Sequence, residues 1–120
     1  MTLLLSVLFG PSAARAQSLE SVLRPLPRTL PGMVIVQHMP EKFTAMYAQR
    51  LDGLCALNVR EVRSLTQAEV GFVYLARGDA DLIISKRSHG FCLMPAPSDP
   101  RFLWHPSVER MVRSALHCAN

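Results

Sequence analysis

The chain has 120 residues, enough for one domain with a single hydrophobic core. Apolar residues make up 49% and charged residues 18%, which is typical of a folded globular protein and not of a disordered or fibrous one. There are 13 Lys and Arg against 9 Asp and Glu, giving a net charge of +4, but the basic residues are scattered. We therefore expect no nucleic-acid partner, and no apolar run approaches the roughly 20 residues that a membrane span needs.

The cysteines indicate a reducing compartment. Cys55, Cys92 and Cys118 are odd in number and far apart, and no C-x-x-C pair is present. This pattern is typical of reduced thiols and not of a disulfide framework or a metal site. We expect a cytoplasmic protein with no metal and no cofactor.

The apolar run from Leu3 to Phe9 has two interpretations. Ala14-Arg15-Ala16 before Gln17 is similar to a signal-peptide cleavage site, which would make the chain a small secreted protein. No Lys or Arg precedes Leu3, however, and the run is short for a signal sequence. A parallel strand covered on both faces also has continuous apolar residues. Both interpretations remain open at this point.

Strand and helix patterns alternate along the chain. The apolar positions between Ala16 and Leu26 recur at helical spacing, and Met33 to Val36 form a second apolar run. A strand, helix and second strand within about 30 residues predict a βαβ unit with parallel strands. The pattern further predicts a helix opened by Pro40 and ending near Gly53, strands at 59–63 and 70–76, a hairpin of 81–86 with 91–94, a loop at 96–100, and a helix from Pro106.

This order predicts an α/β fold, a three-layer sandwich with a mostly parallel, Rossmann-like sheet. A terminal helix in such a fold normally leads into another strand. We therefore expect residues 1–120 to form a partial domain, incomplete at the C-terminus.

Two polar residues follow the first two strands. Ser12 comes shortly after the first strand, and His38 follows the second directly. Ligands of parallel sheets bind beyond the carboxyl ends of the strands, and neighbouring strands lie about 4.8 Å apart. An imidazole that accepts the proton of a serine makes the hydroxyl a nucleophile, and the N–H of Ala13 is placed to bind the resulting oxyanion. A serine before a helix is also a common N-cap, and a lone histidine is often structural.

Three segments have distinctive sequences, namely Val-Ile-Val-Gln-His-Met-Pro-Glu-Lys-Phe-Thr at 34–44, Val-Tyr-Leu-Ala-Arg-Gly-Asp at 73–79 and His-Pro-Ser-Val-Glu at 105–109. They resemble the catalytic domain of the CheB-type protein-glutamate methylesterases of bacterial chemotaxis, and the first segment is the most specific match. Residues 73–79 are similar to the family's Y-I-A-P-G-D turn, and residues 105–109 to its H-R-P-S-V-D helix start. The resemblance runs nearly end to end.

The resemblance implies a serine hydrolase with Ser12 as nucleophile and His38 as catalytic histidine. Its substrates would be glutamyl methyl esters, and also glutamines for deamidation, on methyl-accepting chemotaxis receptors. Because receptor methylation sites face the cytoplasm, the resemblance also implies a cytoplasmic signal-transduction protein without membrane insertion.

The chain departs from the family in two places. The family's S-T-G-G is Ser12-Ala13-Ala14-Arg15 here, and the acid of the family's triad falls beyond Asn120. Loss of a triad acid typically lowers kcat about 10⁴-fold. A catalytically inactive fragment that binds receptors is therefore the alternative, beside the secreted protein named above.

Overall fold

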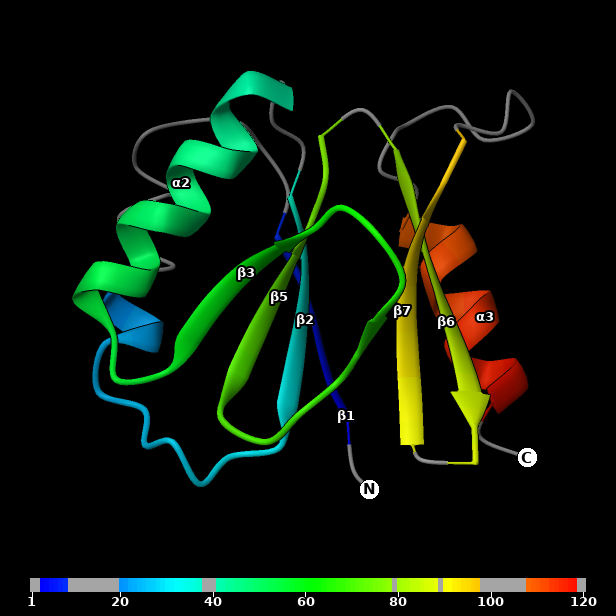
Figure 1. Ribbon diagram of the computed structural model, residues 1–120, viewed down its shortest axis with the longest axis horizontal. Helices are drawn as coiled ribbons and strands as arrows, with labels where there is room; N and C mark the ends of the chain where they lie inside the picture. Colours follow the sequence, from blue (N-terminus) through cyan, green and yellow to red (C-terminus); the bar gives the residue numbers. More distant parts are fainter. Residues whose placement is uncertain are drawn as a thin grey trace.

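The computed structural model describes residues 3–8, 20–37, 41–78, 80–88, 90–97 and 108–118. Four strands form a parallel sheet in the order β1-β2-β5-β3 (Figure 1). These strands are β1 (Leu3–Leu8), β2 (Gly32–Gln37), β3 (Asn58–Val62) and β5 (Phe72–Ala76). The predicted mostly parallel sheet is confirmed.

The N-terminal apolar run forms a strand. β1 pairs with β2 along its whole length, from Leu3 opposite Gly32 to Leu8 opposite Gln37. The parallel direction agrees with the predicted βαβ unit. Of the helix predicted between the two strands, the described part is helical at residues 20–23.

Helix α2 (Glu41–Leu54) covers one face of the parallel sheet, together with residues 20–23 (Figure 1). It begins directly after Pro40, as the sequence predicts, because proline is tolerated at a helix start and not in its interior. The core on this face is apolar and consists of Leu23, Ile35, Tyr47, Ala48, Leu51, Leu57, Val59, Val73 and Leu75.

The other face packs against a second sheet. This antiparallel sheet has the order β4-β7-β6, and helix α3 (Val108–Cys118) packs on β6. Its strands are β4 (Thr66–Gln67), β6 (Asp81–Arg87) and β7 (Gly90–Ala96). The predicted hairpin and the final helix are confirmed. The three-layer arrangement of the whole domain stays a prediction.

β7 is longer than the sequence predicts, and β4 was not predicted. β7 continues through Pro95 to Ala96, whereas the sequence placed the end of this strand near Met94. A proline has no N–H to donate to a neighbouring strand. Because β4 pairs with β7 only at Cys92 and Leu93, Pro95 has no partner in β4, and its missing N–H removes no hydrogen bond between these strands. β4 itself has two residues, which are too few for a periodic pattern.

An ion pair fastens α3 to the second sheet. The Asp81 side chain is fully buried, and its Oδ2 lies 2.8 Å from Nη1 of Arg110. The same Nη1 donates a hydrogen bond to the Pro97 carbonyl at 2.8 Å. Ser114 on α3 also accepts the Ile84 N–H of β6 at 2.9 Å. These polar contacts fix α3 in one position over an otherwise apolar interface.

We expect Arg110→Ala to lower the free energy of unfolding by about 3 kcal/mol, because it removes the guanidinium from a buried carboxylate. Arg113→Ala is the matched control. It removes the exposed Arg113–Glu109 pair of the same helix, which is worth less than about 1 kcal/mol. Urea unfolding followed by circular dichroism measures both. Equal losses in the two variants would contradict the role assigned to the buried pair.

Candidate active site

The parallel strands end together at one edge of the sheet, here called the carboxyl edge. Leu8 at the end of β1 is opposite Gln37 at the end of β2, and Val62 of β3 is opposite Ala76 of β5. His38 follows Gln37 directly, and Ser12 comes four residues after Leu8. The strands that precede Ser12 and His38 therefore end at neighbouring points of the carboxyl edge.

The three residues predicted for the site lie outside the described part of the structure. These residues are Ser12, Ala13 and His38. That these residues lie close together stays a prediction. It is supported by the pairing of Leu8 with Gln37, which makes β1 and β2 end level with each other. The described side chains at the same edge belong to α2, β3 and the turn after β5.

Thr44 joins these three elements. It lies in the first turns of α2 and is fully buried. Its hydroxyl donates a hydrogen bond to Oε2 of Glu61 in β3. The same oxygen accepts the N–H of Gly78, in the turn after β5, at 3.4 Å. We call Thr44, Glu61 and Gly78 the Thr44 clamp.

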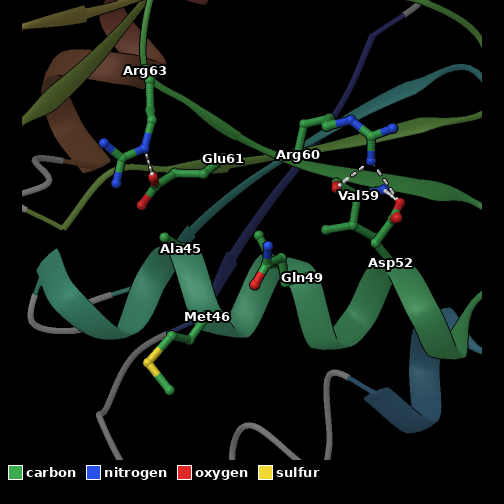
Figure 2. A pocket seen from close by; sticks show the side chains of 9 residues that line it. Ala45, Met46, Gln49, Asp52, Val59, Arg60, Glu61 and Arg63 are labelled. Atoms are coloured by element: carbon green, nitrogen blue, oxygen red, sulfur yellow. Dashed lines mark hydrogen bonds and ion pairs between the residues drawn. The ribbon is translucent and has the colours of Figure 1, made fainter.

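Glu61 is a buried carboxylate, with only 4% of its side chain exposed. Its Oε1 lies 2.5 Å from Nε of Arg63 and forms an ion pair with it (Figure 2). The geometry of this contact does not meet the criteria of a hydrogen bond. Burying a charge is costly unless a partner compensates it. The Thr44 hydroxyl and the Arg63 guanidinium supply this compensation from two sides.

A groove of about 490 Å³ runs between α2 and β3, the outermost strand of the described parallel sheet (Figure 2). The Glu61–Arg63 pair lies near the start of α2, and Asp52 lies near its end. The side chains along the groove are mixed in polarity and belong to Ala45, Met46, Ala48, Gln49, Asp52, Val59, Arg60, Glu61 and Arg63.

A second polar contact lies at the far end of the groove. Oδ1 of Asp52 accepts the Val59 N–H at 2.8 Å and Nη1 of Arg60 at 2.7 Å. Arg60 also donates to the Val59 carbonyl at 2.9 Å. The hydrogen bond from the Val59 N–H, helped by Arg60, lowers the pKa of Asp52. These bonds occupy backbone groups of β3 that would otherwise be free to pair with another strand.

Burial favours the neutral forms of the Tyr47, Cys55 and Tyr74 side chains. It raises the pKa of Tyr47 to about 12, and it raises the pKa of Cys55 and of Tyr74 above the ordinary values. A cysteine with a raised pKa is a thiol at neutral pH and a weak nucleophile. We therefore assign no chemical step to Cys55.

Within the described ranges, no three His, Cys, Asp or Glu side chains come close enough to hold a metal ion. Among the helices that the structure describes, none is long and apolar enough to cross a membrane.

Comparison with known proteins decides the family. The family model for CheB methylesterase matches residues 7–120. The chain belongs to the CheB methylesterase family. The resemblance stated from the sequence is thereby confirmed.

Two relatives and one solved structure illustrate the match. The chain is 46% identical over 111 residues to protein-glutamate methylesterase/protein-glutamine glutaminase 3 of Rhodospirillum rubrum, covering 92% of this chain and 30% of that protein. It is 41% identical over 110 residues to the Vibrio cholerae protein of the same name, covering 91% and 31%. The CheB methylesterase catalytic domain of Thermotoga maritima matches with a TM-score of 0.82 and 30% identity, covering 98% of this chain and 62% of that one. The chain thus spans about 30% of the length of these curated CheB relatives.

Sequence reasoning did not identify the Thr44 clamp. Thr44 and Glu61 are 17 positions apart, so no local pattern joins them. One signal was available, because Glu61 shares a strand face with the buried Val59 and stands next to the end of β3. A charged residue at such a position requires a partner inside the fold.

We expect Asp52→Asn to lower the free energy of unfolding at pH 7. The folded state lowers the pKa of Asp52 below its ordinary value of 3.8. The stabilisation is therefore complete well above pH 3.8 and is lost as the pH falls through the folded pKa. Urea unfolding of both chains from pH 7 to pH 3 measures this difference. A difference that stays constant over this range would refute the electrostatic origin of the contact.

Proposed function

We propose that this chain supplies the nucleophile and the base of a protein-glutamate methylesterase, with Ser12 and His38 in these roles. The observation that carries the proposal is the register of β1 and β2, in which Leu8 and Gln37 end level at the carboxyl edge. The family match over residues 7–120 supports the same assignment. Residues 1–120 then form part of a methylesterase domain.

In the proposed reaction, the Ser12 hydroxyl attacks the carbonyl carbon of a glutamyl methyl ester, and His38 accepts its proton. The N–H of Ala13 donates to the oxyanion that forms. His38 then returns the proton to the leaving oxygen, which departs as methanol. His38 then takes a proton from a water molecule, which attacks the acyl-serine and releases glutamate, and His38 returns the proton to the oxygen of Ser12. With a glutamine substrate, ammonia leaves in place of methanol.

No residue of 1–120 is assigned to the acid that orients the histidine. When residues 1–120 are assayed by themselves, the serine and histidine are expected to work about 10⁴-fold more slowly than in a complete triad. Ala14 and Arg15 also stand where the family has glycines, so the backbone beside the nucleophile carries side chains. The proposed activity is therefore slow.

The proposed substrates are the methylation sites of methyl-accepting chemotaxis receptors, which face the cytoplasm. The relatives' names specify a glutamate methylesterase and a glutamine glutaminase. The side chains at Ala14 and Arg15 favour a second candidate, a receptor-binding module that performs no hydrolysis. Binding of receptor signalling helices that persists in Ser12→Ala, without methanol release by either chain, would select this second candidate.

Ser12→Ala and His38→Gln test the hydrolase directly. The two residues act as one unit, so each substitution is expected to remove the same large part of kcat, at least about 10²-fold. The assay follows methanol release from a receptor signalling fragment carrying methyl-esterified glutamates. The surface substitution Arg113→Ala is the control and is expected to keep the full rate. An unchanged rate in Ser12→Ala would reject the serine mechanism.

A further inference from the structure

We infer that Glu61 is a positioning residue for the proposed base, His38, and that it acts through Thr44. The role of His38 itself rests on the proposed function. Glu61 and Thr44 touch no reacting atom in this account. They hold the start of α2, which lies three residues after His38.

Residues 38–40 connect two fixed points. On one side, Gln37 is held in the sheet opposite Leu8. On the other side, α2 starts at Glu41, and its first turns are held by Thr44. Successive Cα atoms are 3.8 Å apart, so covalent connectivity limits His38 to one such step from Gln37 and three from Glu41. We expect a shift of the start of α2 to reach His38 through this short connection.

The Thr44 clamp holds the start of α2 through two contacts, one with β3 and one with the turn after β5. Thr44 is fully buried, so its hydroxyl bonds within the protein and not to bulk solvent. Glu61 is held by Arg63 and belongs to β3, which is in turn paired with β5. The Gly78 N–H adds a contact from the turn after β5. A hydrogen bond to a carboxylate is about twice as strong as one between neutral groups, which makes Glu61 the dominant member.

A second polar contact between α2 and β3 allows the positioning of His38 to be distinguished from a general effect of Glu61 and Thr44 on stability. Asp52 links the end of α2 to Val59 and Arg60 at the start of β3. This contact lies at the opposite end of the groove from the Glu61–Arg63 pair (Figure 2). Both contacts join α2 to β3, but Thr44 lies in the first turns of α2 and Asp52 lies near its end.

The test compares four variants of the whole chain. Glu61→Gln and Thr44→Val weaken the clamp, Thr44→Ser retains the hydroxyl as a rescue variant, and Asp52→Asn is the matched control. The first readout is the rate at which diethyl pyrocarbonate modifies His38, mapped by mass spectrometry with the exposed His117 as internal reference. Circular dichroism confirms that each variant is folded before the measurement.

We expect Glu61→Gln and Thr44→Val to change the modification rate of His38 relative to His117, and Thr44→Ser and Asp52→Asn to leave it unchanged. In ester hydrolysis, measured with p-nitrophenyl acetate, the first two should lower kcat, by up to about 10²-fold, with KM retained. An unchanged His38 rate in both clamp variants, or an equal change in Asp52→Asn, would overturn the inference.

Failure of the proposed function has a different signature. If the unsubstituted chain and Ser12→Ala hydrolyse the ester at the same rate, the hydrolase proposal fails. The modification rate of His38 does not depend on hydrolysis, so it still decides whether Glu61 and Thr44 position that residue.

Discussion

The parallel pairing of β1 with β2 is the contact on which the proposed chemistry depends. A slip of one residue in this pairing would move the end of one strand past the end of the other. The continuous register from Leu3 opposite Gly32 to Leu8 opposite Gln37 makes both strands end level. The strands that precede Ser12 and His38 therefore end side by side, although these two residues are 26 positions apart in the sequence.

Polar contacts determine the position of α2 along the sheet, which apolar packing alone does not fix. The apolar face of α2 attaches the helix to the sheet, but the hydrophobic effect has no direction and allows a helix to slide. Asp52 at one end of α2 and Thr44 at the other bond to β3 and fix its position. The two contacts have different effects. Asp52 bonds to the Val59 N–H of β3, so that this N–H is not free to pair with another strand, and Thr44 holds the start of α2 at the carboxyl edge.

Sequence reasoning predicted the elements whose patterns are local and long. The apolar runs of β1 and β2 and the helical spacing of α2 were all predicted from the sequence and are confirmed. β4 was not predicted because two residues are too few to show a periodic pattern. The end of β7 was placed too early because a proline, Pro95, is unusual inside a strand. The Glu61–Thr44 bond joins distant positions and depends on tertiary packing. The proposed catalytic residues followed from strand ends and family resemblance, and their meeting stays a prediction.

The most direct measurement is the pKa of the His38 imidazole in two variants, Ser12→Asp and Ser12→Asn, followed by NMR titration. A carboxylate within about 4–6 Å favours the protonated imidazole, whereas the amide of the same shape does not. If position 12 and His38 meet at the carboxyl edge, the pKa of His38 is higher in Ser12→Asp by about 1 or more. The same pKa of His38 in both variants would contradict the account.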